Sequence, residues 1–189
     1  MKKNIVLVGI LGCGKSSLGK KLAKRLSMEY VDMDAVIEEE AQMTITDMFA
    51  RFGEPYFRDK ETELCRRLAR RHGLVISTGG GVIQRPENME ALKETGLVIF
   101  VDRSPWTIIE TIDVSNRPLL RENPQRLFEL YARRLPLYRK YADVIFKNRG
   151  SLRQAAVTLM RELSAYPPFE ICAGQRHPSI AGRRVYRKR

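Results

Sequence analysis

One segment near the start of the chain, G-I-L-G-C-G-K-S at positions 9–16, constrains the fold more than any other feature. It fits the pattern G-x-x-x-x-G-K-[S/T], follows an apolar run at 5–8 and precedes leucines at helical spacing. A strand, a glycine-rich turn and a helix in this order make up a phosphate loop. The segment therefore predicts an α/β fold and the binding of a nucleoside triphosphate.

Each residue type in this loop suits a chain of phosphates. Glycines let successive backbone N–H groups point at an anion, and the following helix adds its positive N-terminal end. Lys15 is expected to reach the β- and γ-phosphates, and the Ser16 hydroxyl is expected to hold Mg²⁺. Cys13 lies inside the loop, where a small side chain that fills a tight turn is favoured over a redox-active thiol.

Composition is typical of a soluble globular protein. The 189 residues, 43% of them hydrophobic and 30% charged, suit one domain with a sizeable core. No stretch approaches the ~20 apolar residues that span a bilayer, so we expect no membrane partner. The three cysteines, at 13, 65 and 172, fit neither a zinc nor a disulfide spacing, which indicates reduced thiols and a cytoplasmic location.

The charge of the chain favours anionic ligands without choosing among them. The net charge is +12, and segment 164–189 alone carries six basic residues and one acidic residue. Aromatic and basic residues are not interleaved in the body, so a nucleic-acid partner is not expected there, and the terminal segment leaves only a small chance of one. Prolines and glycines break its periodicity, and we interpret 164–189 as a flexible tail after a domain at 1–163.

Short apolar runs alternate with helical patterns through the domain, which is typical of a parallel sheet. The expected strands lie at 5–8, 30–32, 74–77, 97–101 and 143–146. Between 113 and 123 the periodicity fails between two helical patterns, so we expect a mobile lid there. A helix is expected over 124–141, with Pro136 disturbing it.

Polar residues and glycines follow the second and third expected strands, where ligands gather in open α/β sheets. In extended geometry Asp32 and Asp34 point to the same side, so one could fix Mg²⁺ through water and the other accept a hydrogen bond from an attacking hydroxyl. The alternative is that both only cap the next helix. Gly79, Gly80 and Gly81 could bind an anion or a hydroxyl through backbone N–H groups, or form only a tight turn.

Arginines supply the candidate groups for an anionic substrate. Arg58 lies beside Phe57, and Glu61 follows one helical turn later. An aromatic wall, a guanidinium group and a carboxylate that orients it would hold an organic acid. Because Arg58 lies on a helix rich in charged residues, the alternative is that its side chain is only solvated. The same two interpretations, ligand binding or solvation, apply to Arg117 and Arg134.

Taken in their order along the chain, these motifs resemble those of the shikimate kinase family, and the resemblance covers residues 3–163. The matching segments are GILGCGKS at 9–16 with LGKKLA at 18–23, VDMD at 31–34, ITDMF at 45–49 with GEPYFR at 53–58 and Glu61, STGGG at 77–81, NRPLL at 116–120, and RLPLY at 134–138 with AD at 142–143. Six motifs in register are far more specific than a phosphate loop alone.

The resemblance implies both a fold and a reaction. The fold would be a three-layer α/β sandwich of the P-loop kinase type, with a mostly parallel five-stranded sheet of order 2-3-1-4-5, helices on both faces and a lid. The reaction would be the Mg²⁺-dependent transfer of the γ-phosphoryl group of ATP to the 3-hydroxyl of shikimate, carried out by a monomer.

The resemblance also implies a role for each matching residue. Lys15, Asp34 and Arg117 would be catalytic, and Arg117 would close with the lid onto the transferring charge. ATP would be bound by Gly12, Cys13, Gly14, Lys15, Ser16, Ser17 and Arg117, and Mg²⁺ by Ser16 and, through water, by Asp32. Shikimate would be bound by Asp34, Arg58, Arg134, Gly79, Gly80, Gly81, Phe49 and Phe57.

Two segments depart from the family pattern. Between Trp106 and Arg117 the chain has no basic residue where family members often carry an arginine that stacks near adenine, and 147–150 differs from the usual adenine-side loop. Two other functions therefore stay open: a kinase for another polyol acid such as gluconate, and a sensor that kept the pocket without turnover. The paired arginines, Asp34 and the three glycines favour shikimate.

Overall fold

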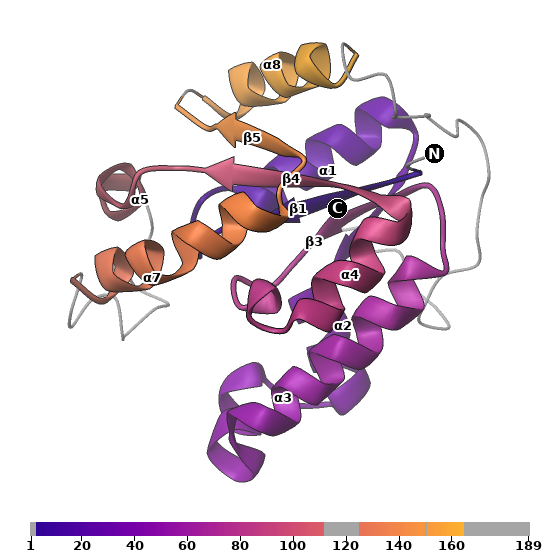
Figure 1. Cartoon of the computed structure of the whole chain (residues 1–189), viewed down its shortest axis with the longest axis vertical. Coiled ribbons are helices and arrows are strands. Elements are labelled where there is room, and N and C mark those ends of the chain that lie inside the picture. The colour runs from indigo at the N-terminus through magenta and orange to yellow at the C-terminus, as the bar shows by residue number, and fades with distance from the viewer. Residues whose placement is uncertain (1–2, 112–124, 150, 165–189) are drawn as a thin grey trace, which may run out of the picture.

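The computed structural model describes residues 3–111, 125–149 and 151–164. The expected lid at 113–123, Arg117 within it, and the expected tail from residue 165 onward lie outside the described residues (Figure 1). In the part that is described, no helix has both the length and the apolar character needed to cross a membrane.

Five strands form one sheet with the order β2-β3-β1-β4-β5, and every neighbouring pair is parallel (Figure 1). The strands are β1 (Asn4–Val8), β2 (Glu29–Asp32), β3 (Leu74–Ser77), β4 (Gly96–Asp102) and β5 (Val144–Lys147). Each strand overlaps the apolar run predicted for it. The expected fold class and strand order are therefore confirmed.

Helices cover both faces of this sheet. α1 and α8 pack against each other on one face, whereas α4 and α7 lie on the other face (Figure 1). α2 and α3 form an arm that extends beyond the sheet at the bottom of that view. The bounds are α1 (Lys15–Leu26), α2 (Met33–Ala41), α3 (Ile45–Ala69), the 3-10 turn η1 (Val82–Gln84), α4 (Pro86–Thr95), α5 (Pro105–Thr111), α7 (Gln125–Tyr141) and α8 (Leu152–Ser164).

The central strand β1 lies in the middle of the hydrophobic core and leads into the phosphate loop. All five of its residues are buried, and Ile5 pairs with Val75 of β3 on one side and with Leu97 of β4 on the other. A strand in the middle of a parallel sheet is covered on both faces, so it needs an apolar residue at nearly every position. The continuous apolar run at 5–8 meets that requirement and fixes the starting point of the phosphate loop.

Among the described helices, two contain a proline beyond their first residue, and each accommodates it differently. α3 changes direction at Gly53, whose φ of 79° and ψ of 168° leave the helical region, and Pro55 follows in the first turn of the second segment. The expectation that Pro136 disturbs α7 is wrong, because this helix continues through it. Pro136 cannot donate to the carbonyl of Ala132, but both residues are exposed, so water can satisfy that carbonyl.

Candidate active site

The phosphate loop connects β1 to α1 and curves around the side chain of Lys15. This side chain is buried, and its Nζ donates to the carbonyls of Gly9 (2.8 Å) and Ile10 (3.1 Å). The ammonium group therefore lies inside the loop, where terminal phosphates would meet it. Gly14 has a φ of 101°, and an added Cβ would lie 2.9 Å from Nδ2 of Asn148, so the loop needs glycine there.

The two aspartates after β2 share a cavity with this loop, although not through extended backbone. β2 ends at Asp32 and α2 begins at the buried Met33, so Asp34 lies in the first turn of a helix and the expected extended geometry is wrong. Asp32 occupies the N-cap position but makes no side-chain capping bond, so capping does not explain it. Both carboxylates line a cavity of about 270 Å³, together with Leu11, Gly12, Gly14, Lys15, Ser16, Ser17, Ser77, Thr78 and Gly80.

Two hydroxyl groups hold the carboxylate of Asp32. Its Oδ2 accepts hydrogen bonds from Ser16 Oγ at 3.0 Å and from Tyr30 Oη at 2.9 Å. Burial, assisted by the charge of Asp32, raises the pKa of Tyr30 to about 12, so the phenol remains a donor at neutral pH. Sequence reasoning missed Tyr30, because a tyrosine in a half-buried strand carries no local sign of such a contact.

The oxygen atoms at this point fit Mg²⁺. A serine hydroxyl and a carboxylate are hard ligands, and Mg²⁺ usually takes only one or two protein groups beside water and phosphate oxygens. Across residues 3–111, 125–149 and 151–164, no group of three or more His, Cys, Asp or Glu side chains could hold a metal. Ser16 and Asp32 therefore suit a metal that is bound together with the phosphates of a nucleotide better than one bound by protein groups alone.

Asp34 lies between the phosphate loop and a second group of charged side chains. A Cβ added to Gly79 would lie 2.8 Å from Asp34 Oδ1 and 2.9 Å from Glu61 Oε1, so two carboxylates approach this glycine. Burial raises the pKa of Asp34, and the charge of Asp32 adds to this effect, while Lys15 opposes it. Glycine at position 79 is what allows the two acids to come this close.

Arg58 is held in place by two carboxylates of its own helix. Its Nη1 lies 2.8 Å from Glu61 Oε2, its Nη2 lies 2.7 Å from Glu54 Oε1, and its side chain is 12% exposed. The guanidinium carbon is 5.1 Å from the centre of the Phe57 ring. Burial lowers the pKa of Arg58, but the two carboxylates outweigh it and raise the pKa. The interpretation of Arg58 as a solvated arginine is therefore wrong.

Arg134 reaches the same three-glycine turn from α7. Its Nη1 donates to the carbonyl of Gly80 at 3.2 Å. Burial lowers the pKa of Arg134, and the nearby charge of Arg58 lowers it further. Arg58 itself lies against Gly81, where an added Cβ would overlap the guanidinium group. The structure thus brings both arginines, predicted from separate motifs, to one turn.

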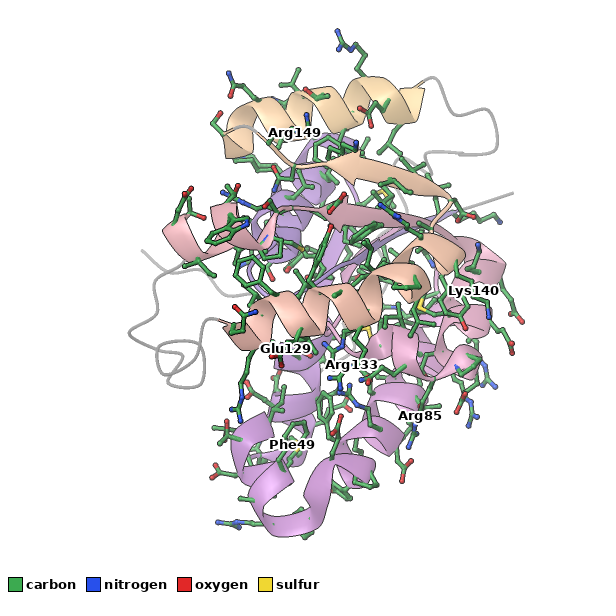
Figure 2. The ribbon with its side chains drawn as sticks, turned by 60° about the vertical axis from the view of Figure 1, so that its left-hand side comes forward. Phe49, Arg85, Glu129, Arg133, Lys140 and Arg149 are labelled. Atoms are coloured by element: carbon green, nitrogen blue, oxygen red, sulfur yellow. The ribbon has the colours of Figure 1, made fainter. Side chains whose placement is uncertain are left out.

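The two predicted aromatic residues pack against each other next to Arg58. The rings of Phe49 and Phe57 are 5.3 Å apart and meet edge to face, with Phe57 buried and Phe49 40% exposed. Figure 2 shows Phe49 on the α2–α3 arm, and it shows Glu129 and Arg133 on the side of α7 that faces this arm. The facing sides of the arm and α7 therefore carry aromatic and charged side chains.

A second cavity, of about 400 Å³, lies at the carboxyl ends of β4 and β5. Asn148 connects it to the phosphate loop, because its Nδ2 donates to the carbonyl of Cys13 at 2.9 Å. Sequence reasoning noted this segment only as a departure from the family pattern and missed the contact. The cavity is lined by Asp102, Ser104, Pro105, Thr107, Tyr131, Lys147, Asn148 and Arg149.

The fold and the first cavity are those of a P-loop protein that handles nucleotide phosphates. The arginines, carboxylates and glycines next to that cavity add a place for a small anionic molecule with hydroxyl groups. A protein that holds both in adjoining positions is a small-molecule kinase of the P-loop class.

Comparison with known proteins identifies the family. The family model for shikimate kinase matches residues 11–164. Shikimate kinase of Clostridium botulinum (strain Eklund 17B / Type B) is 45% identical over 152 residues, which cover 80% of this chain and 92% of the relative. Shikimate kinase of Thermodesulfovibrio yellowstonii is 45% identical over 151 residues, 78% of this chain and 87% of the relative. The chain belongs to the shikimate kinase family.

Solved structures agree with this assignment. Shikimate kinase from Acinetobacter baumannii in complex with shikimate matches with a TM-score of 0.81 and 37% identity, covering 88% of this chain and 96% of that chain. Shikimate kinase from Aquifex aeolicus matches with a TM-score of 0.76 and 29% identity, covering 86% of this chain and 96% of that chain.

Proposed function

We propose that this chain transfers the γ-phosphoryl group of ATP to the 3-hydroxyl of shikimate. The position of Asp34 carries the proposal, because this residue lines the cavity of the phosphate loop and also lies against Gly79 beside Glu61. A hydroxyl group bound by Asp34 would thus lie between the terminal phosphate and the two arginines. Family membership, and the shikimate named for the Acinetobacter baumannii structure, support this acceptor.

The nucleotide would be held by the phosphate loop and the second cavity. Backbone N–H groups of 12–17 and the ammonium group of Lys15 would neutralise the phosphates. Ser16 and, through water, Asp32 would hold Mg²⁺, which supplies positive charge to the β- and γ-phosphates when bound. The cavity of about 400 Å³ beyond β4 and β5 would accept the base, since Asn148 places it next to the loop. Arg117 would approach the γ-phosphate from the lid.

The acceptor would be held by its carboxylate and its ring. Arg58 and Arg134 would bind the carboxylate, and Glu61 would keep Arg58 in the orientation that a bidentate contact requires. Phe49 and Phe57 would flank the ring, and backbone groups of 79–81 would contact the hydroxyls.

The chemical step would be an in-line displacement. The oxygen of the 3-hydroxyl forms a bond to the γ-phosphorus while the bond from that phosphorus to the bridging oxygen of ADP breaks. The proton of the hydroxyl passes to Asp34, whose pKa is raised chiefly by burial and therefore suits a proton acceptor better than an exposed aspartate would. Lys15 and Arg117 would stabilise the negative charge on the transferring group and on ADP.

A monomer suffices for this proposal, because every group that it uses comes from one chain. We also infer a cytoplasmic protein, and the free thiols of Cys13 and Cys65 agree with that location. A nucleic-acid partner is not expected for the body of the chain, and the basic segment 164–189 leaves only a small chance of one. Size-exclusion chromatography with light scattering would test the oligomeric state directly.

An acceptor assay tests the proposed reaction. Purified protein with ATP and Mg²⁺ should form ADP when shikimate is added, and should form little with gluconate or without an acceptor. Stimulation by gluconate instead would favour the kinase for another polyol acid. Shikimate binding without any ADP formation would favour the sensor.

A further inference from the structure

The carbonyl groups of the three-glycine turn are held in two different ways. The carbonyl of Gly79 accepts the backbone N–H of Val82 at 3.3 Å, and that of Gly81 accepts the N–H of Gln84 at 3.0 Å. The carbonyl of Gly80 instead accepts from two side chains of α7. Tyr138 Oη lies 2.6 Å from it, and Arg134 Nη1 lies 3.2 Å from it. The middle of the turn therefore depends on α7.

The two donors to the Gly80 carbonyl differ in how firmly they are placed. The side chain of Tyr138 is fully buried, and its ring stacks on Phe100 of β4 with centroids 4.9 Å apart and an interplanar angle of 13°. Arg134 makes the longer contact, and its Nε is buried without a hydrogen-bond partner among the described residues. Tyr138 is thus a fixed donor, whereas Arg134 makes one long contact and leaves its buried Nε without a partner among the described residues.

A substrate carboxylate would change this arrangement. Because hydrogen bonds from a guanidinium group to a carboxylate are stronger than those to a neutral carbonyl, the anion would draw the N–H groups of Arg134 away from Gly80. A half-buried carbonyl that loses its hydrogen bonds to the protein raises the free energy of the complex and weakens binding. With Tyr138 in place, the Gly80 carbonyl keeps its shorter hydrogen bond when Arg134 leaves.

We propose that Tyr138 is a positioning residue of the carboxylate subsite, which keeps the Gly80 carbonyl hydrogen-bonded while Arg134 moves from that carbonyl to the carboxylate of the substrate. This inference rests on the proposed function, because it assigns the carboxylate to Arg134. It adds to that function a residue that does not itself contact the substrate. Its contribution is to keep the half-buried Gly80 carbonyl hydrogen-bonded when Arg134 leaves the turn.

Tyr138→Phe isolates the hydroxyl group, because phenylalanine keeps the ring that stacks on Phe100. We expect calorimetry to show shikimate binding weakened about 10-fold, which corresponds to the loss of one partly buried hydrogen bond, with ADP affinity changed less than about 2-fold. Tyr141→Phe is the matched control, since this tyrosine also lies on α7 and is buried but lines neither cavity. It should leave shikimate affinity unchanged. Equal losses for shikimate and ADP in Tyr138→Phe would overturn the inference.

A double-mutant cycle separates this role from a merely structural one. In an Arg134→Ala background no arginine leaves the carbonyl, so Tyr138→Phe should weaken shikimate binding by less than about 2-fold. A full 10-fold effect in that background would overturn the inference. If wild-type protein binds no shikimate at all, the proposed function fails; if it binds shikimate and Tyr138→Phe binds it equally well, only this inference fails.

A crystal structure of the wild-type chain with shikimate tests the inference without relying on a variant that folds. Tyr138 Oη should remain within hydrogen-bond distance of the Gly80 carbonyl, while Arg134 contacts the carboxylate and no longer contacts that carbonyl. An Arg134 that stays on the carbonyl, or a Tyr138 that leaves it, would contradict the proposal.

Discussion

The hydroxyl of Ser16 donates a hydrogen bond to Oδ2 of Asp32 at 3.0 Å, which joins the first turn of α1 to the end of β2. The same oxygen accepts from Tyr30, and the hydroxyl of Ser77 lies 3.4 Å from that of Ser16. The phosphate loop and the neighbouring strand ends are thus connected by hydroxyl groups around one carboxylate. This arrangement places the two proposed Mg²⁺ ligands, Ser16 and Asp32, in direct contact.

Asp32→Asn should raise the Mg²⁺ concentration needed for tight ADP binding. Asparagine keeps an oxygen that can accept from Ser16 and Tyr30 but removes the negative charge that would orient a metal-bound water. We expect an increase of about 10-fold or more in the Mg²⁺ concentration at half-maximal ADP binding, measured by calorimetry. Tyr30→Phe keeps the charge and removes one donor, so it should have a smaller effect. An unchanged Mg²⁺ dependence in Asp32→Asn would exclude Asp32 from the metal site.

Arg58→Lys should weaken shikimate binding and leave ATP binding nearly intact. Lysine keeps the positive charge beside Glu61 but cannot form the two parallel hydrogen bonds of a guanidinium group with a carboxylate. We expect the KM for shikimate to rise about 10- to 100-fold and the KM for ATP to change less than about 2-fold. Arg67→Lys changes an exposed ion pair with Glu40 and serves as the control. Equal changes in both KM values would show that Arg58 does not bind the carboxylate.

Gly79→Ala should reduce turnover by displacing the acids around the acceptor hydroxyl. The new methyl group would lie 2.8 Å from Asp34 Oδ1 and 2.9 Å from Glu61 Oε1, so at least one carboxylate must move. We expect kcat/KM for shikimate to fall about 10-fold or more, because small displacements of reacting groups are costly in rate.

Gly73→Ala is the matched control for that substitution. Gly73 has a φ of 74° with nothing within 4 Å of an added Cβ, so alanine there meets no neighbour but strains the backbone. It should lower stability by about 1 kcal/mol and leave kcat/KM unchanged. Gly79→Ala with normal kinetics would show that Asp34 and Glu61 are not held against this glycine.

Features that depend on local sequence were predictable. The phosphate loop, the strands and the turn at 79–81 each follow from a short pattern, because a buried parallel strand needs a continuous apolar run and a close backbone approach needs glycine. Arg58 and its partner Glu61 were predictable as well, since residues three apart on a helix face each other. The strand order came from the family resemblance rather than from any of these patterns.

Contacts between distant segments were not predictable from the same patterns. Tyr138 and Gly80 are 58 residues apart, and Asn148 and Cys13 are 135 apart, so no local periodicity connects them. The geometry of Asp34 was predicted wrongly, because extended backbone was assumed to continue past the end of β2. Only the position where α2 begins determines where that carboxylate points.

Titration of Glu61 should make the protein less stable as the pH rises. An ordinary ion-paired acid, whose pKa is lowered by folding, has the opposite effect. Burial raises the pKa of its carboxyl above the ordinary value of 4.5, although the charge of Arg58 opposes the shift. Its Oε1 is buried and, among the described residues, has no hydrogen-bond partner. The folded protein therefore binds a proton at pH values where the unfolded chain has already released it. Its free energy of unfolding must fall as the pH rises from the unfolded to the folded pKa.

Glu61→Gln removes this titration and provides the comparison. Urea unfolding of both proteins between about pH 4.5 and 7.5 should show the stability of wild type, relative to Glu61→Gln, declining with rising pH by at most about 1.4 kcal/mol per pH unit. A difference that grows with pH would mean that the ion pair with Arg58 outweighs burial, and that the folded pKa of Glu61 lies below its ordinary value.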